Sequence, residues 1–388
     1  MTIKNILKSS VFLIALTLFV SCNEEAKVPA DSFTVSGTIK GLDTKYMSRS
    51  VTDSSGKRST DSIFVENGKF SYTAKINKAE HIIFWPNVER TIKRTERGYY
   101  PAKSSQFAFL AKPGDNIVFN GDVSDFINAY PSGTKGNDDL AKINSKVFPL
   151  MNASVNYLLK KNQLEKGDPW IKIVTDSITK LDKEVVRLKT EFVQNNPTSE
   201  AAVWYLSDMM VRSQISNEDA VTAFNKFDKN LKDFTYYKEL ASRIKGIEST
   251  LIGKTVPDFT SNKTIDGKDF TFSSLQGKYV LIDFWGVWCG PCVAEMPTVK
   301  KYADKYSDKL TILGINTGDT KEKMVNFLKK NDYNWQQIMS GKDTDNLVLK
   351  FNVAGFPTKF IIDPEGKIIQ RYLGSGEKAF NKLDELLK

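Results

Sequence analysis

The sequence predicts an α/β layered domain at the carboxyl end of the chain, preceded by a small antiparallel β domain and an all-helical region. Three patterns predict this order. Residues 33–126 show the alternation of strands, residues 137–250 carry apolar side chains at helical spacings, and beyond residue 250 strands and helices alternate. A chain of 388 residues is long enough for two or three folded units. We therefore divide it into residues 31–130, 131–250 and 251–388.

Composition and charge exclude several classes of protein. With 40% hydrophobic and 26% charged residues, the chain has the composition of a globular protein rather than of a disordered or fibrous one. The net charge of +9 is spread over the whole length instead of being concentrated in one segment. Because the sequence has neither a basic patch nor a nucleic-acid-binding motif, we expect no nucleic-acid partner.

The first 22 residues have the pattern of an export signal. Lys4 and Lys8 precede the apolar run 11–20, which is too short to cross a bilayer but suits the core of a signal peptide. The run ends in Phe19-Val20-Ser21-Cys22, which resembles the signal of bacterial lipoproteins, although phenylalanine replaces the usual leucine.

This resemblance implies that Cys22 becomes the lipidated first residue of the mature protein, with residues 23–30 as a tether. Asn23 stands where lipoproteins of the inner membrane commonly carry aspartate, so the resemblance favours an outer-membrane anchor facing the periplasm. A plain cleaved signal and an uncleaved anchor are the alternatives.

Residues 31–130 show the signals of a strand-rich domain. Apolar side chains alternate from Phe33 to Ile39, and the short runs 63–65 and 70–72 flank Asn67-Gly68, a strong hairpin turn. Further strands are predicted at 82–85, 107–111 and 117–120, with Pro113-Gly114 as a turn. We expect no catalytic motif in this domain.

Residues 131–250 are predicted to be helical. In the clearest helix Asp168 is the expected N-cap, Pro169 takes the first position, and Asn195-Asn196-Pro197 ends it. An apolar stripe runs along one face of this helix, formed by Ile171, Val174, Ile178, Leu181, Val185, Leu188 and Phe192. The stripe must pack either on neighbouring helices, such as 201–211 and 220–231, or on a second copy of the chain in a homodimer.

From residue 251 onward the pattern is that of an α/β domain. A strand pair is expected at 256–260 and 270–272, and Tyr279–Trp285 forms a continuous apolar run, as in a central strand buried on both faces. The remaining elements are helices at 292–306, 321–330, 346–351 and 377–387, and strands at 311–316, 358–362 and 367–372.

The chain has three cysteines, and two of them lie in the motif Trp288-Cys289-Gly290-Pro291-Cys292 after the central strand. A chain of this size does not need a disulfide in order to fold, so the pair is predicted to be chemical. The free N–H groups and partial positive charge of a helix N-terminus stabilise a thiolate. Cys289 is therefore the predicted nucleophile, and Cys292, one turn inward, the resolving thiol.

Half of a zinc site is the alternative interpretation of two cysteines at this spacing. The sequence offers no second cysteine pair, and the single histidine, His81, falls in a strand of another domain. We therefore expect no metal site, and we expect His81 to be a surface histidine or a satisfied strand histidine.

The cysteine motif, together with Asp283-Phe284-Trp285 before it and Gly355-Phe356-Pro357-Thr358 after it, resembles the active site of thioredoxin. Over residues 251–388 the resemblance is greatest to envelope oxidoreductases of the TlpA and ResA type. It implies a thioredoxin fold, protein disulfides as substrates, an electron donor in the membrane and no cofactor. The β-rich segment ahead of it also resembles a module often found in such lipoproteins.

The same resemblance assigns roles to individual residues. Asp283 matches the proton acceptor of the inner cysteine, and Glu295 matches an acid that assists it, although a turn cap and a solvent-facing glutamate are the alternatives. Pro357 is expected to be cis, so that Phe356 pairs with the substrate strand. Trp288 supplies an apolar rim, with Trp285 as a second candidate or as core. Gly290 and Pro291 shape the turn and are typical of reductants.

Two other functions compete with the oxidoreductase interpretation. A peroxidase of the peroxiredoxin type needs threonine three residues before its cysteine and proline four residues before that, but Gly286 and Ile282 occupy these places. Alternatively, the protein is a surface binding lipoprotein in which residues 31–250 do the work and the redox domain is ancillary.

Overall fold

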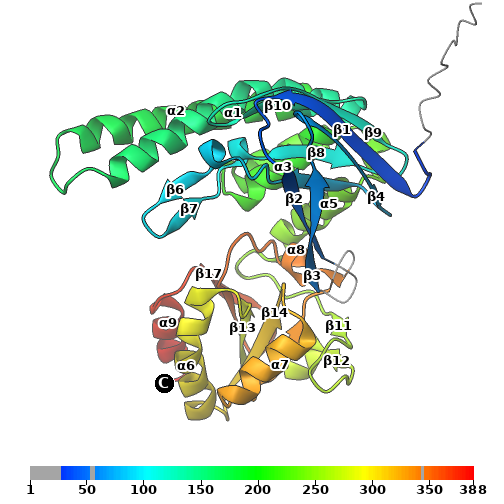
Figure 1. Ribbon diagram of the computed structural model, residues 1–388. Helices are drawn as coiled ribbons and strands as arrows, with labels where there is room; N and C mark the ends of the chain where they lie inside the picture. The colour runs from blue at the N-terminus through cyan, green and yellow to red at the C-terminus, as the bar shows by residue number, and fades with distance from the viewer. Residues whose placement is uncertain (1–27, 53–56, 342–344) are drawn as a thin grey trace, which may run out of the picture.

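The computed structural model describes residues 28–388 except for 53–56 and 342–344. The predicted fold class is confirmed: a β-rich region is followed by helices and then by an α/β domain (Figure 1). The predicted export signal and Cys22 lie outside the described residues, as does most of the predicted tether. Within the part of the chain that the structure describes, no helix combines the length and the apolar character that a membrane span requires.

The largest sheet of the amino-terminal region has four strands. Their order is β10 (Ile127–Ser132), β9 (Asn116–Val123), β1 (Ser32–Lys40) and β4 (Lys69–Lys75). The outer two pairs are antiparallel, as predicted, but β1 and β9 run parallel, with Thr34 opposite Asn116. The prediction of an antiparallel domain is therefore wrong for this pair. Phe33, Val35 and Phe119 of the central strands are fully buried in the core.

Three two-stranded ribbons complete this region. They are β2 (Tyr46–Thr52) with β3 (Arg58–Phe64), β5 (Glu80–Phe84) with β8 (Phe107–Ala111), and β6 (Lys93–Thr95) with β7 (Gly98–Tyr100). The turn at Asn67-Gly68 forms with φ angles of 50° and 74°. However, the strands on either side of it separate after a single bridge from Glu66 to Lys69, because β3 pairs with β2 and β4 with β1. The turn was predicted correctly, but the hairpin was not.

Five α-helices make up the middle of the chain: α1 (Lys135–Asn162), α2 (Trp170–Asn195), α3 (Glu200–Val211), α4 (Asn217–Asn225) and α5 (Thr235–Ser249). Helices α1 and α2 form a long antiparallel hairpin (Figure 1). The apolar stripe of α2 is buried or half-buried along its whole length, with Val174 and Val185 least exposed. Packing within one chain therefore accounts for the stripe, while a homodimer remains a prediction.

The β-rich and helical regions share buried polar contacts. The Asn137 side chain of α1 accepts a hydrogen bond from Leu110 N at 2.9 Å and donates one to Leu110 O at 2.8 Å. The His81 ring stacks on Trp204 at 4.0 Å, and its backbone N–H donates to Tyr236 Oη. Burial lowers the pKa of His81 to about 3, and its Nε2 has no hydrogen-bond partner among the described residues. His81 therefore lies in a strand, as predicted, but it is half-buried rather than on the surface, and its ring is not fully hydrogen-bonded within the described residues.

The α/β domain is built on a five-stranded sheet. Its order is β15 (Gln336–Met339), β14 (Leu310–Asn316), β13 (Tyr279–Trp285), β16 (Thr358–Ile362) and β17 (Ile368–Leu373). The central strand β13 is parallel to β14 and antiparallel to β16. As its apolar run predicted, β13 is buried on both faces, because Leu281 belongs to one apolar cluster and Ile282 to another.

Helices cover both faces of this sheet (Figure 1). The face that carries Leu281 and Trp285 is covered by α6 (Gly290–Lys305), α7 (Lys321–Lys330) and α9 (Lys378–Leu386). The short helix α8 (Leu347–Lys350) and the opening pair β11 (Thr260–Ser261) and β12 (Phe270–Thr271) cover the other face. The opening pair is shorter than predicted, and β15 was not predicted at all.

The helical region is fixed to the α/β domain where α5 meets α8. A Cβ atom at Gly246 would lie 2.6 Å from Lys350 O and 2.7 Å from Leu349 O, so only glycine allows this approach. Nearby, Arg243 Nη1 donates a hydrogen bond to Val353 O at 3.0 Å. The α/β domain therefore packs on the helical region through specific contacts rather than being joined to it only by a loose linker.

Candidate active site

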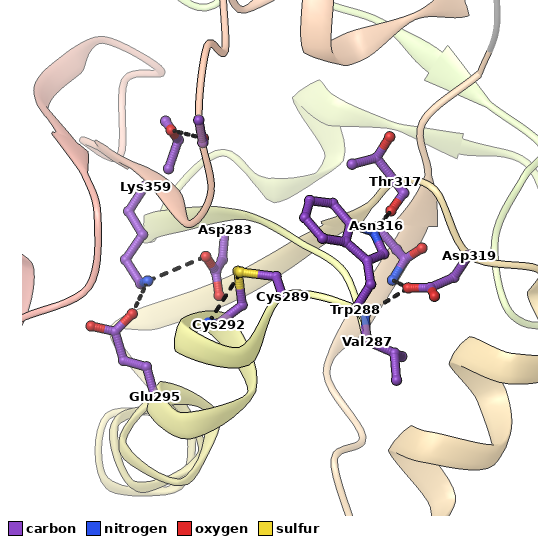
Figure 2. Close-up of a disulfide and its surroundings, with 12 residues drawn as sticks. Asp283, Val287, Trp288, Cys289, Cys292, Glu295, Asn316, Thr317, Asp319 and Lys359 are labelled. Atoms are coloured by element: carbon purple, nitrogen blue, oxygen red, sulfur yellow. Dashed lines mark hydrogen bonds and ion pairs between the residues drawn. A yellow bond between two sulfur atoms is a disulfide. The ribbon is translucent and has the colours of Figure 1, made fainter. Parts of the chain in front are cut away.

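The two motif cysteines lie where the central strand passes into a helix. Cys289 is the N-cap of α6, and its Sγ accepts a hydrogen bond from Cys292 N at 3.2 Å. Pro291 lies in the first turn, where a missing N–H costs nothing. The two sulfur atoms form a disulfide, which is the oxidised form of the predicted dithiol (Figure 2). The first sulfur is thus placed at the positive end of the helix dipole.

Apolar side chains surround this disulfide. Cys289 and Cys292 are only 5% and 3% exposed, and they belong to a cluster with Trp285, Met296 and Met324. Trp285 is fully buried, and its indole N–H donates to Gln337 Oε1 at 2.9 Å. Of the two interpretations of Trp285, core packing is correct.

Trp288, in contrast, is 51% exposed beside the disulfide (Figure 2). Its indole N–H donates to Thr317 O at 2.7 Å, and its ring meets that of Phe356 edge-on at 5.3 Å. A Cβ atom at Gly286 would lie 2.3 Å from the indole nitrogen, and one at Gly318 would lie 2.8 Å from it. Two glycines therefore make room for the exposed ring.

Asp319 fixes the loop in front of the cysteines. Its Oδ2 accepts hydrogen bonds from Val287 N at 2.6 Å and from Asn316 Nδ2 at 3.0 Å (Figure 2). Asp319 and Gly318 were not among the predicted site residues, because their role depends on the return of β14 alongside β13. Their only local signal is a polar, glycine-containing turn at the carboxyl end of a strand adjacent to the motif.

The loop before β16 lies next to the cysteine motif. The Phe356–Pro357 peptide bond is cis, as predicted. Phe356 packs on the apolar cluster that contains both cysteines, and the Thr358 hydroxyl donates to Gly355 O at 2.7 Å. The structure thus brings Trp288, Phe356 and the disulfide together, while their role in substrate binding remains a prediction.

Next to the disulfide, the buried Asp283 and the largely buried Glu295 share one buried lysine. Asp283 of β13 lies opposite Lys359 of β16 in the antiparallel register, and Lys359 Nζ is 3.3 Å from Asp283 Oδ1. The same Nζ donates a short hydrogen bond to Glu295 Oε2 of α6, and Glu295 Oε1 accepts another from Gly376 N at 2.9 Å. Asp283 lies inside the strand, so it does not cap a turn. The Glu295 side chain is only 10% exposed, so it is not a solvent-facing glutamate.

Burial is the main influence on the Asp283 carboxyl. Burial raises its pKa, the positive charge of Lys359 opposes that rise, and the negative charge of Glu295 adds to it. Lys359, which is 1% exposed, was not among the predicted site residues. A lysine inside the otherwise apolar strand 358–362 is the signal that could have revealed it, because a buried cation needs a partner.

No cluster of three or more histidine, cysteine, aspartate or glutamate side chains that could hold a metal ion occurs in residues 28–388, the two short gaps apart. The groups that the structure brings together at this site are the two sulfurs and the carboxylates of Asp283 and Glu295, with Lys359 between them.

Comparisons with known proteins match two segments of the chain. The redoxin family matches residues 251–387, and a domain of unknown function (DUF4369) matches residues 33–140. The thiol-disulfide oxidoreductase ResA of Bacillus cereus is 33% identical over 157 residues, which is 40% of this chain and 86% of the relative. ResA of Bacillus subtilis is 36% identical over 132 residues, or 34% of this chain and 72% of the relative.

Among solved structures, the thioredoxin domain of a thiol-disulfide oxidoreductase from Bacteroides vulgatus is 28% identical. It covers 36% of this chain and 99% of its own, with a TM-score of 0.33.

Proposed function

Because this chain belongs to the ResA family of thiol-disulfide oxidoreductases, we propose that it reduces disulfide bonds in other proteins, with Cys289 as the nucleophile and Cys292 as the resolving thiol. The observation that supports these roles is the position of Cys289 at the N-cap of α6, where its sulfur accepts the Cys292 N–H. A developing negative charge on this sulfur would be stabilised by the helix N-terminus.

The proposed reaction has two exchange steps. The Cys289 thiolate attacks one sulfur of the substrate disulfide, and the other substrate sulfur leaves with the bonding electron pair. Cys292 then loses its proton and attacks Cys289 Sγ, which forms the Cys289–Cys292 disulfide and releases the second substrate sulfur as a thiolate. Two protons from solvent or from the site neutralise the substrate thiolates. The substrate is reduced by two electrons, and the dithiol is oxidised by two.

We further propose that the exposed ring of Trp288 and the loop at Phe356 and Pro357 form the surface on which the substrate chain docks. The proximity of both to the disulfide supports this proposal. Gly290 and Pro291 remain the proposed determinants of a reducing active site.

Family membership favours the oxidoreductase over the binding-lipoprotein alternative and over the peroxidase alternative. The packing at residue 286 adds a physical reason against the peroxidase. Any side chain there would begin 2.3 Å from the Trp288 indole, so the required threonine would displace that ring.

The place of the protein in the cell also belongs to this proposal. The pattern of residues 1–22 supports export, lipidation at Cys22 and attachment to the outer membrane facing the periplasm. A protein that reduces disulfides there must be re-reduced, so we propose a membrane electron donor as its second partner.

The direction of electron flow is tested by the redox potential of the Cys289–Cys292 couple in the full chain. We expect a value of about −270 mV, as in thioredoxin, because the proposed function is reduction. The measurement equilibrates the protein with glutathione or dithiothreitol buffers and follows tryptophan fluorescence. A potential near about −120 mV, as in a strong oxidant, would contradict the reductase proposal while leaving the family membership intact.

A further inference from the structure

Lys359 is the buried cation of the α/β domain. Among the described residues 251–388, no other lysine or arginine is buried, and the Lys359 side chain is 2% exposed. Burying an ammonium group in an apolar layer is costly unless its charge is paired. The fold nevertheless places it on the face of the sheet that α6 covers, directly opposite Asp283.

The two carboxylates that share Lys359 are held unequally. Glu295 has both oxygens engaged, one by Lys359 Nζ and the other by Gly376 N at 2.9 Å. Asp283 Oδ1 lies 3.3 Å from Lys359 Nζ, but no hydrogen bond to it is present among the described residues. In Figure 2 the Asp283 carboxyl group lies on the disulfide side of Lys359, and Glu295 lies on the other side. Asp283 is therefore the carboxylate with a free lone pair near the cysteines.

We propose that Lys359 is a positioning residue of the exchange reaction: anchored by Glu295, it holds the Asp283 carboxylate ready to accept the proton of Cys292. This inference rests on the proposed function, in which Cys292 attacks the mixed disulfide. The proton passes from Cys292 Sγ to Asp283, and the thiolate electron pair forms the new bond to Cys289 Sγ. The substrate sulfur leaves as a thiolate, and Asp283 returns its proton to that thiolate or to solvent. Glu295 acts through Lys359 and takes no proton.

The charges around Asp283 predict the direction in which each substitution shifts its pKa. Lys359 faces Asp283 from β16, and Glu295 and Cys292 lie beside it on α6 (Figure 2), while its partner in β14 is the uncharged Gly314. Lys359 lowers the pKa of Asp283, while Glu295 raises it. Removing the cation must therefore make Asp283 a carboxylate only at higher pH, and removing the charge of Glu295 must have the opposite effect.

The test compares pH profiles of full-length Lys359→Met and Glu295→Gln with that of the unaltered chain. Each protein is reduced with dithiothreitol, freed of it and mixed with oxidised glutathione, and the rate of closure of the Cys289–Cys292 disulfide is followed between pH 4 and pH 9. The acid limb of each profile is the pH range in which the closure rate rises with pH. We expect the midpoint of this limb to lie about one pH unit or more higher in Lys359→Met, and to lie at a lower pH in Glu295→Gln, than in the unaltered protein. Lys278→Met, which removes an exposed lysine immediately before β13, should leave the pH profile unchanged.

Shifts of the acid limb in opposite directions in the two variants would support the inference. A merely structural role of Lys359 does not predict opposite shifts. The inference would be overturned if the acid limbs of the two variants did not move or moved in the same direction. It would also be overturned if Glu295→Gln lost the closure step, because Glu295 itself would then be the proton acceptor. If Lys359→Met does not fold, the downward shift in Glu295→Gln decides alone. If the unaltered protein fails to exchange disulfides at all, the proposed function fails instead.

Discussion

Replacing Cys292 by serine will trap the protein as a mixed disulfide with its substrates, whereas replacing Cys289 by serine will abolish covalent capture altogether. The resolving attack comes from Cys292, which lies one turn inside α6 with its N–H bonded to Cys289 Sγ. Without that second sulfur, the bond between Cys289 and the substrate has no internal route to cleavage. Either change should lower disulfide reductase turnover by about a thousandfold or more, because both sulfurs act in every cycle.

The measurement uses the full chain in envelope extracts or with a disulfide-containing peptide. Adducts that dithiothreitol releases are separated on non-reducing gels and identified by mass spectrometry. The Cys289→Ser variant is the matched control, since both variants lose one sulfur and the disulfide. Equal capture by the two variants would contradict the assigned roles. Capture by Cys289→Ser alone would reverse them.

Replacing Asp283 by asparagine will slow the resolving step by about a hundredfold, the typical contribution of a positioned general base. Burial raises the pKa of Asp283, so the carboxylate that accepts the Cys292 proton is lost as the pH falls through that raised value. The closure rate should therefore rise with pH through that region in the unaltered protein. In Asp283→Asn this rise should disappear, because asparagine does not titrate.

The control for this prediction is Asp304→Asn, which removes a 62% exposed carboxylate from the outer face of the same helix α6. It should keep both the rate and the pH profile. The readout is the rate of Cys289–Cys292 closure after mixing with oxidised glutathione. An Asp283→Asn protein with an unchanged rate and profile would show that the cysteine proton leaves by another route.

The elements nearest the chemistry were also those that the sequence predicted best. The run Tyr279–Trp285 is apolar at nearly every position, and the structure places β13 over these same residues. Helix α7 and strand β16 likewise match their predicted limits, because capping and turn residues mark both ends of each. Strand β15, in contrast, begins with two glutamines and has no apolar alternation to reveal it.

What the sequence could not supply was the identity of distant neighbours. The parallel pairing of β1 with β9 joins segments about eighty residues apart, and nothing in either strand specifies that partner. For the same reason Asp283 and Glu295 could be proposed separately, but not the lysine that links them, since Lys359 reaches them only through the pairing of β13 with β16. Similarly, in the sequence Gly286 indicated only that the threonine of a peroxiredoxin-type peroxidase is absent. Its close approach to Trp288 depends on the folded loop.

The proposed reaction depends above all on one property of the site: the sulfur at the start of α6 must be a reactive thiolate at neutral pH. Alkylation of the fully reduced protein with iodoacetamide, followed by peptide mass spectrometry from pH 5 to pH 10, tests it directly. We expect Cys289 to be modified far faster than Cys292, with half of its maximal rate reached at about pH 7. Modification of Cys289 only near about pH 8.5, at the rate of a free cysteine, would contradict it.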